Sequence, residues 1–172
     1  MIKNIFISGQ PGCGKTTLIM EILRELKLNA GGFYTQEIKQ RGKRSGFKIT
    51  TLNGKEGILA YVNIKSPYKV GKYKVNIRDL EEIGVKSISG AIKNNRLIVI
   101  DELGKMEMMS EKFKKAVETA LNSKNKVLGT IKLTPDPFTN KIKRREDTKV
   151  FYLTRGNRKK IRNEIINLLG SK

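Results

Sequence analysis

Short apolar runs alternate with amphipathic stretches along most of the chain. Residues 2–8 form an apolar run that ends at Gly9, which is typical of a buried parallel strand. In residues 15–26 the apolar positions recur at helical spacing and predict an amphipathic helix. A second apolar run, residues 97–102, ends in two acidic residues. The chain therefore begins with a strand, a glycine-rich loop and a helix, and a later buried strand ends in carboxylates.

Residues 32–61 have a different pattern, in which turn signals separate strand-like runs. Asn53-Gly54 between two such runs is the strongest short-range signal of a hairpin, and Arg41-Gly42-Lys43 also resembles a turn. We predict an antiparallel meander of two linked hairpins over residues 32–61. Residues 65–78 are basic and irregular, with breakers that predict no regular element.

The remaining pattern predicts more helices and strands. A helix capped by Asn76 or Asp79 is predicted first, with Leu80, Ile83, Ile88 and Ile92 facing inward, and a second helix runs from Ser110 to about Leu121. Strands are predicted at 127–131 and 150–153, with a loop or short helix between them that reaches through the charged run 141–147. A last helix is capped by Asn157. Strands that alternate with helices imply a mostly parallel sheet wrapped by helices with right-handed crossovers. We predict a single α/β domain over residues 1–172, with the hairpins of residues 32–61 as an antiparallel insertion.

Residue types that are absent exclude several kinds of chemistry. The chain has no histidine and one cysteine, so it can hold neither a Ser-His-Asp triad nor a histidine-ligated zinc, nor an internal disulfide. Acid–base work must fall to carboxylates, lysine, tyrosine or water. No apolar run is long enough to span a bilayer. Because cleavage of the N-terminal run would remove the glycine-rich loop, we expect no signal peptide, no membrane partner and a cytoplasmic location.

The net charge indicates an attraction to polyanions. Lysine and arginine number 36 against 16 acidic residues, a formal net charge of +20. Because the basic residues are dispersed along the chain, we interpret most of them as a solvated surface of the kind enriched in proteins from hot environments. Aromatic residues make up only 6% and form no stacking motif with basic ones. Nucleic acid therefore stays an untested second ligand, and no protein partner is indicated.

The glycine-rich loop matches the pattern G-x-x-x-x-G-K-[ST], the Walker A or P-loop motif, at every position. Its residues, which we predict to bind nucleotide, are Gly9, Gln10, Pro11, Gly12, Cys13, Gly14, Lys15 and Thr16. The glycines let successive backbone N–H groups face a phosphate, and the following helix adds the positive end of its dipole. Lys15 is expected to reach the β- and γ-phosphates as a catalytic cation, and the Thr16 hydroxyl to ligate Mg²⁺. Thr17 either caps the loop or touches the α-phosphate.

The acidic strand end supplies the other half of the predicted site. A carboxylate at the carboxyl end of a buried strand lies beside the phosphate crevice of an open α/β sheet, so Asp101 is predicted to hold the Mg²⁺. Glu102 is one residue further on and can accept a proton from the attacking water or orient it. An Asp-Glu pair favours the hydrolytic ATPase branch of P-loop proteins, which usually has one additional strand between the P-loop strand and the acidic strand.

Several segments together resemble a known family over almost the whole chain. The strings GQPGCGKTTL, GGFYTQEIK followed by GFKI, VIDELGKMEMMS and TRGNR are similar to those of the cancer-related nucleoside-triphosphatase family, which is also common in thermophilic archaea and bacteria. The resemblance implies a three-layer, RecA-like P-loop fold and Mg²⁺-dependent release of phosphate from ATP, GTP and other nucleotides. It makes Asp101 the metal-side acid and Glu102 the base, with Lys105 and Glu107 near the site.

The transition state of phosphoryl transfer usually needs one more cation. The candidates are Lys105, Arg144, Arg145 and Arg158, of which Lys105 follows Glu102 closely and Arg158 opens the predicted last helix. Two other functions stay open. One is a nucleotide or small-molecule kinase with residues 141–147 as an arginine-rich lid, and the other is a nucleic-acid-stimulated ATPase.

Overall fold

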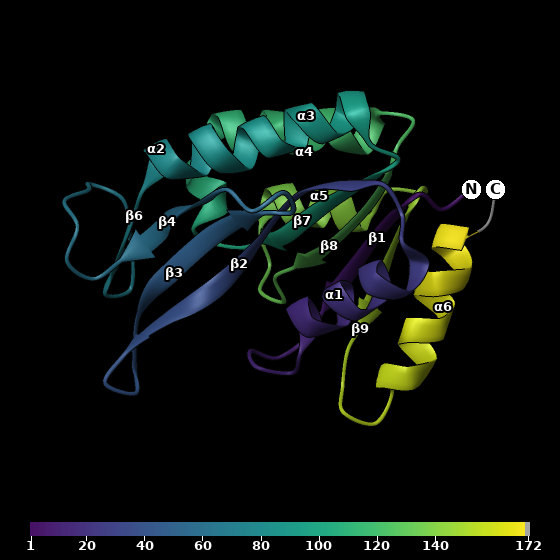
Figure 1. Cartoon of the computed structure of the whole chain (residues 1–172), viewed down its shortest axis with the longest axis horizontal. Coiled ribbons are helices and arrows are strands. Elements are labelled where there is room, and N and C mark those ends of the chain that lie inside the picture. The colour runs from purple at the N-terminus through teal and green to yellow at the C-terminus, as the bar shows by residue number, and fades with distance from the viewer. Residues whose placement is uncertain (171–172) are drawn as a thin grey trace.

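The computed structural model describes residues 1–170, which form one nine-stranded sheet with helices on both faces (Figure 1). The strands are β1 (Asn4–Ser8), β2 (Ala30–Gln40), β3 (Lys43–Thr51), β4 (Glu56–Tyr61), β5 (Lys69–Val70), β6 (Tyr73–Val75), β7 (Leu97–Leu103), β8 (Lys126–Ile131) and β9 (Thr148–Tyr152). Their order in the sheet is β5-β6-β4-β3-β2-β7-β8-β1-β9. The predicted α/β class with a mostly parallel sheet and an antiparallel extension is confirmed.

The parallel part of the sheet has the predicted additional strand. β2, β7, β8, β1 and β9 run parallel to one another, and β8 lies between β1 and β7. Gly129 on β8 is level with Phe6 of β1 on one side and with Ile100 of β7 on the other. The loop that follows β1 and the acidic residues that end β7 therefore lie at the same edge of the sheet, two strands apart.

Two layers of helices enclose the sheet (Figure 1). The helices are α1 (Lys15–Leu26), α2 (Ile77–Asp79), the π-helical segment η1 (Leu80–Val85), α3 (Lys86–Asn94), the short 3₁₀ turn η2 (Glu107–Met109), α4 (Glu111–Asn122), α5 (Pro137–Lys143) and α6 (Arg158–Gly170). The segment α2–η1–α3 and α4 cover one face, whereas α1 and α6 cover the other. Within residues 1–170, none of these helices has the length and apolar character needed to cross a bilayer.

The central strands are apolar on both sides because both faces are covered. Along β7, Ile98 and Ile100 belong to the core under α3 and α4, while Leu97 and Val99 belong to the core under α1 and α6. All four side chains are buried. Successive residues of a strand point to opposite faces, so a strand covered on both faces is apolar at successive positions. Asp101 is the first acidic residue after this run.

β2 joins the parallel and antiparallel parts of the sheet. Its first residues pair in parallel with β7, up to Phe33 opposite Ile100, and its later residues pair antiparallel with β3. The turn between β2 and β3 has left-handed backbone at Arg41 (φ 47°) and Gly42 (φ 75°), as a tight hairpin requires. β3 in turn pairs antiparallel with β4, so the two hairpins predicted for residues 32–61 are present. We refer to residues 34–47, which extend beyond β7, as the hairpin arm.

The expectation that residues 65–78 lack regular structure was wrong. β5 and β6 form a short hairpin there, and β6 also pairs with β4, with Ala60 opposite Val75. The edge of β4 supplies the hydrogen-bonding partners that a pattern limited to residues 65–78 does not reveal. The helix predicted to follow is capped by the Asn76 side chain, which accepts a 3.1 Å hydrogen bond from the N–H of Asp79.

Two predictions near the C-terminus also have clear outcomes. The segment predicted as a loop or short helix contains α5, whose first turn is capped by Asp136 through the N–H groups of Phe138 (3.0 Å) and Thr139 (3.2 Å). Asn157 immediately precedes α6, but its side-chain oxygen accepts from the N–H of Thr154 at 2.8 Å. Asn157 therefore fixes the loop before α6 through its side chain.

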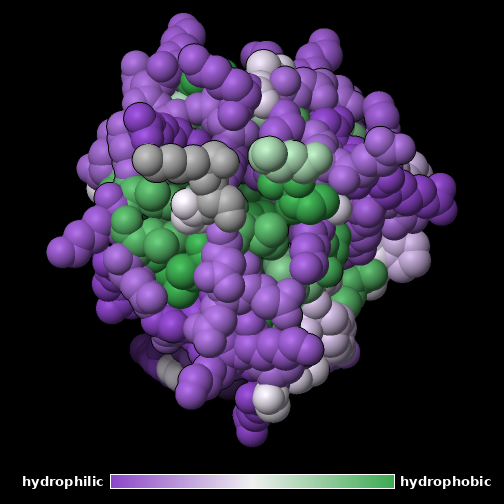
Figure 2. All heavy atoms as spheres, turned by 90° about the vertical axis from the view of Figure 1, so that its right-hand side faces the viewer, coloured by the Kyte–Doolittle hydropathy of each residue, from purple (hydrophilic) through white to green (hydrophobic). Residues whose placement is uncertain are grey.

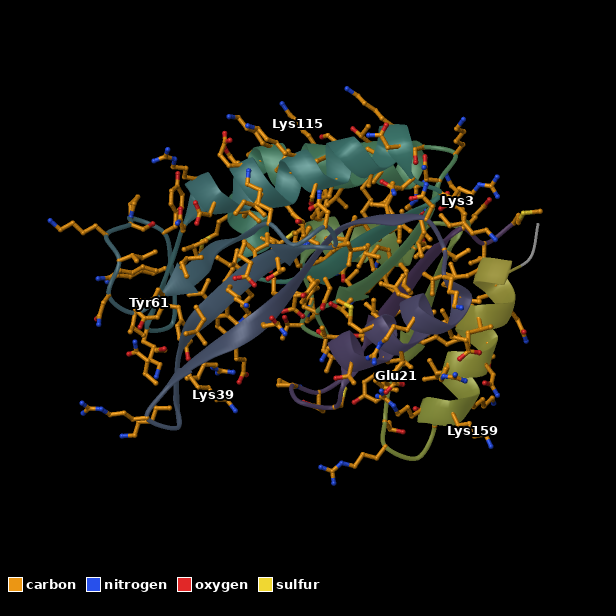
Figure 3. The ribbon with its side chains drawn as sticks, viewed as in Figure 1. Lys3, Glu21, Lys39, Tyr61, Lys115 and Lys159 are labelled. Carbon is orange, nitrogen blue, oxygen red and sulfur yellow. The ribbon has the colours of Figure 1, made fainter. Side chains whose placement is uncertain are left out.

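The surface agrees with the basic composition. Figure 2 shows the end of the molecule where α6 lies, and hydrophilic residues dominate it, with hydrophobic ones gathered near its middle. Long basic side chains project from both helical layers, as Lys115 on α4 and Lys159 on α6 illustrate (Figure 3). The basic residues are spread over the molecule, as the sequence predicted.

Candidate functional site

A cleft of about 730 Å³ opens where β1 and β7 end. One wall is the loop between β1 and α1, the floor is the end of β7 with the residues after it, and the facing wall is the hairpin arm. Its lining includes Gly9, Gln10, Pro11, Gly12, Gly14, Lys15, Thr16, Thr17, Thr35, Gln36, Glu37, Arg44, Phe47, Val70, Asp101, Glu102, Gly104, Lys105, Met106, Glu107 and Lys132. Strands far apart in the sequence therefore contribute to one cavity.

The glycine-rich loop has the backbone geometry of an anion cradle. Gly12 (φ 75°) and Gly14 (φ 90°) adopt left-handed conformations that residues with a side chain rarely adopt. Gly14 is the N-cap of α1 and provides no side-chain cap, so the first N–H groups of this helix are left to the cleft. The ammonium of Lys15 donates to the carbonyls of Gly9 and Gln10, both at 3.0 Å. Lys15 is thus held within the loop at the mouth of the cleft.

Two hydroxyl groups hold the Asp101 carboxylate. The Thr16 hydroxyl donates to Oδ2 and the Thr130 hydroxyl donates to Oδ1, each at 2.5 Å. Asp101 is only 3% exposed. Burial raises the pKa of Asp101, while the two hydroxyl hydrogen bonds and the charge of Lys15 act in the opposite direction. Only these groups offset the cost of burying the negative charge of Asp101, so the carboxylate is well suited to bind a cation.

Glu102 and Glu107 form an acidic pair on the two sides of Gly104. A Cβ placed on Gly104 would lie 2.7 Å from Glu102 Oε1 and 2.9 Å from Glu107 Oε2. Glu107 is buried, and its Oε2 accepts a 3.2 Å hydrogen bond from the N–H of Gly104. Burial and the charge of Glu102 raise the pKa of Glu107 well above its ordinary value, and burial and the charge of Asp101 raise that of Glu102. Glycine at position 104 leaves room for both carboxyl groups.

Most of the residues predicted for the site line this cleft. Of the predicted nucleotide-binding residues, Cys13 alone is missing from its described lining. The sulfur of Cys13 lies instead near Gly9, and a Cβ placed on Gly9 would be 2.8 Å from it. Cys13 packs against the core under α1 and α6. Lys105, which we expected near the site from the resemblance, is exposed and lines the cleft.

Arg158 contacts the phosphate loop from α6 without lining the cleft itself. Its Nη1 donates to the carbonyl of Gly14 at 3.1 Å, and its Nη2 lies 3.0 Å from a carboxylate oxygen of Glu21. Figure 3 shows Glu21 on α1, on the side where α6 lies. Arg158 thus ties α6 to the phosphate loop from outside the cleft lining, and its catalytic role stays a prediction.

The charged run 141–147 is also outside the cleft lining. Arg145 bonds both carboxylate oxygens of Asp147 at 2.9 Å and the side chain of Asn122 at 3.0 Å. These contacts fix Arg145 against the end of α4, and the arginine-rich lid considered for a kinase stays an untested alternative. Arg144 is exposed and has no place in the cleft either.

Three residues of this site were missed by the sequence analysis. Thr130 reaches Asp101 from β8, and Arg44 and Phe47 reach the cleft from the hairpin arm. The only available signal for Thr130 was its position near the carboxyl end of a predicted parallel strand. No local pattern distinguishes Arg44 from the other basic residues of its turn, because its place in the cleft depends on the pairing of β2 with β7.

Comparison with known proteins agrees with this geometry. A protein-family model described as NTPase matches residues 4–166. The chain is 53% identical over 165 residues to nucleoside-triphosphatase THEP1 of Thermotoga maritima, covering 96% of this chain and 94% of the relative. It is 36% identical over 187 residues to the cancer-related nucleoside-triphosphatase of Homo sapiens, covering 99% of this chain and 98% of the relative.

Solved structures show the same fold. The crystal structure of THEP1 from the hyperthermophile Aquifex aeolicus superposes with a TM-score of 0.87 at 35% identity, over 98% of this chain and 99% of that one. The solution structure of a human cancer-related nucleoside triphosphatase gives a TM-score of 0.85 at 35% identity, over 99% of this chain and 98% of the other. With a P-loop, a carboxylate bonded to its threonine and relatives matched over nearly their full length, this chain belongs to the NTPase family.

Proposed function

We propose that the protein hydrolyses nucleoside triphosphates, ATP and GTP among them, to the diphosphate and phosphate in a Mg²⁺-dependent reaction. The observation that carries this proposal is the 2.5 Å hydrogen bond between Thr16 of the phosphate loop and Asp101, with Glu102 lining the same cleft. The proposal is also consistent with relatives that are named nucleoside-triphosphatases.

The oxygen ligands at the site fit magnesium. The Thr16 hydroxyl and the Asp101 carboxylate are hard oxygen donors that already lie in contact, and the carboxylate is buried. Within residues 1–170 no three Asp, Glu, Cys or His side chains are grouped as a metal site, so phosphate oxygens and water would complete the coordination. When bound there, Mg²⁺ would neutralise charge on the phosphates.

In the proposed reaction, residues of the chain position the nucleotide and take up a proton. The N–H groups of the phosphate loop bind phosphate oxygens, and Lys15 moves from the carbonyls that it now contacts to the β- and γ-phosphates. Glu102 orients a water molecule and accepts its proton. The water oxygen forms a bond to the γ-phosphorus, while the bond from that phosphorus to the β–γ bridging oxygen breaks.

Broad base preference follows from the same contacts. The phosphate loop binds phosphates through its backbone and through Lys15, and these groups are common to all nucleoside triphosphates. We therefore expect that ATP, GTP, CTP and UTP are all hydrolysed at comparable rates.

The test is release of phosphate from this panel of nucleotides, with and without Mg²⁺. Lys15→Ala should abolish release because it removes the cation at the β- and γ-phosphates. Lys115→Ala is the matched control, since it removes one exposed lysine from α4, which covers the face of the sheet opposite to α1. Activity that survives Lys15→Ala and chelation of Mg²⁺ would refute the proposal.

Two outcomes would point to the other functions. Phosphate transfer that occurs only when a small-molecule acceptor is added would identify a kinase. Turnover that rises severalfold with RNA or DNA at physiological salt would identify a nucleic-acid-stimulated ATPase, because simple charge attraction weakens steeply as salt increases.

A further inference from the structure

Arg44 lines the nucleotide cleft from the wall opposite the phosphate loop. Its Nε donates to the Tyr73 hydroxyl at 2.9 Å and its Nη1 to a carboxylate oxygen of Glu37 at 2.8 Å. The guanidinium carbon also lies over the Phe47 ring, 5.3 Å from its centroid. Within residues 1–170, Nη2 of Arg44 donates no hydrogen bond. The neighbours thus hold the Arg44 side chain in place, while the N–H donors of its Nη2 have no partner among these residues.

The residues that make these contacts come from three strands. Glu37 is on β2, Arg44 and Phe47 are on β3, and Tyr73 is on β6. The Tyr73 ring packs edge-on against the Phe47 ring at 5.2 Å and is buried. The hydrogen bonds to Tyr73 and Glu37 raise the pKa of Arg44, whose charge is permanent. The hairpin arm therefore presents a fixed cation to the cleft, although 44% of the Arg44 side chain is exposed.

The order of the strands places this cation on the side of the terminal phosphate. The phosphate loop follows β1, Asp101 and Glu102 lie near the end of β7, and β2 with the hairpin arm lies beyond β7. A triphosphate with its β- and γ-phosphates at Lys15 has its terminal phosphate toward Asp101 and Glu102, where metal and water belong. The hairpin arm is then the next wall beyond that phosphate.

The charge in this part of the cleft calls for such a cation. Asp101, Glu102 and Glu107 all line it, and each would repel the terminal phosphate. The other cations in the lining are Lys15 of the phosphate loop, the exposed Lys105, and Lys132, which lies 3.3 Å from the Asp136 carboxylate. Arg44 is itself paired with Glu37, but unlike these lysines it is held by a ring hydroxyl as well and has a planar fork of donors. The candidates Arg145 and Arg158 are outside the lining, where Arg145 bonds Asp147 and Arg158 pairs with Glu21.

We propose that Arg44 is a substrate-binding residue of this cleft that contacts the terminal phosphate of the bound nucleotide. It balances the negative charge that the phosphate brings toward the carboxylates, and it stabilises the charge that shifts as the bond to the leaving diphosphate breaks. Tyr73 and Glu37 act as positioning residues through Arg44. The catalytic part of this role rests on the proposed hydrolysis. The contact between Arg44 and the terminal phosphate requires only that the nucleotide binds.

Binding provides the first test. The affinities of ADP and of a non-hydrolysable ATP analogue are measured with Mg²⁺ at physiological salt, for the wild type and for Arg44→Ala. We expect the ADP affinity to change less than about twofold and the preference for the triphosphate to fall about tenfold, because only the triphosphate reaches the arm. An equal loss of affinity for both nucleotides, or no loss for either, would overturn the proposal.

Turnover provides the second test. Arg44→Ala should lower kcat by about 10²-fold, the usual cost of removing one donor to transition-state charge. Arg44→Lys keeps the charge but loses the planar fork, so we expect it to restore only a small part of kcat. Tyr73→Phe keeps the ring and removes the hydroxyl, and should lower kcat less than Arg44→Ala with ADP affinity unchanged. A kcat for Arg44→Ala equal to that of the wild type would exclude the catalytic part.

Lys43→Ala is the matched control, because Lys43 precedes Arg44 on the same strand, is exposed and lies outside the cleft lining. It should leave the preference for the triphosphate and kcat unchanged, and thermal melting should show that all variants are folded. If Lys43→Ala reproduced the loss seen for Arg44→Ala, general charge attraction would explain both and the proposal would be wrong. If the wild type released no phosphate, the proposed function would fail, while the binding test of Arg44 would still stand.

Discussion

The Thr16 hydroxyl donates a 2.5 Å hydrogen bond to Oδ2 of Asp101, across 85 positions of sequence. Thr16 lies in the first turn of α1 and Asp101 near the end of β7, and β8 separates the strands from which they extend. That intervening strand also contributes, because its Thr130 holds the other oxygen of the same carboxylate. The additional strand thus sets both the spacing and the orientation of the predicted metal ligand.

Removing the base should separate binding from turnover. In Glu102→Gln the amide keeps the size of the side chain but cannot take a proton from water, so we expect kcat to fall about 10²–10³-fold with nucleotide affinity nearly unchanged. Steady-state phosphate release and binding of a fluorescent nucleotide would measure the two effects. Glu146→Gln, at an exposed position outside the cleft lining, is the control. A Glu102→Gln variant with wild-type kcat would remove Glu102 from the mechanism.

Thr130 should affect the metal site without touching the nucleotide. Thr130→Val keeps the shape of the side chain but removes the hydroxyl that bonds the buried Asp101 carboxylate. We expect a loss of about 1–3 kcal/mol in the free energy of unfolding, measured in urea, and a Mg²⁺ dependence of turnover shifted to higher concentration. Thr119→Val changes an exposed threonine of α4 and serves as the control. Equal Mg²⁺ dependence for wild type and Thr130→Val would contradict this role.

Glu107 should make the protein less stable as pH rises. Burial, together with the charge of Glu102, raises the pKa of Glu107 well above its ordinary value, so the folded state keeps a proton that the unfolded chain loses above about pH 4.3. The stability that this proton contributes is complete below the unfolded pKa and declines as pH rises toward the folded pKa.

Glu107→Gln has no charge to bury and its oxygen can still accept from Gly104. The melting temperature of Glu107→Gln minus that of the wild type should therefore increase between pH 4 and pH 8. Glu146→Gln, with its carboxyl exposed, is again the comparison. A difference that stays constant or shrinks over this range would show that Glu107 is not held protonated by burial.

Gly32 should be essential to the junction between the two parts of the sheet. Its φ is 112°, and a Cβ there would lie 2.1 Å from the carbonyl oxygen of Val99 on β7. Gly32→Ala adds this clash to backbone strain, and we expect at least about 3 kcal/mol of destabilisation. Gly54→Ala has a comparable φ of 94° but open space around it, so it should cost only about 1 kcal/mol. Chemical denaturation of both variants would compare them, and equal losses would show that strain alone matters.

The sequence predicted the elements that depend on local pattern. The helix expected at residues 15–26 begins and ends where α1 does, and the hairpin expected at Asn53-Gly54 joins β3 to β4. Amphipathic spacing and turn chemistry are properties of neighbouring residues, so they can be read without knowing the fold. β5 and β6 were missed because their pairing depends on the edge of β4, which lies outside that segment.

The sequence by itself determined the phosphate loop, since its chemistry belongs to the contiguous residues Gly9 to Thr16 and to the backbone conformations that their glycines allow. Only the tertiary structure decided what surrounds that loop. It placed Asp101 between the hydroxyls of Thr16 and Thr130, bonded Arg158 to the carbonyl of Gly14 and brought Arg44 to the far wall of the cleft. The reason is physical: strand order and pairing set which residues meet at the edge of the sheet, and these long-range contacts leave no local pattern in the sequence.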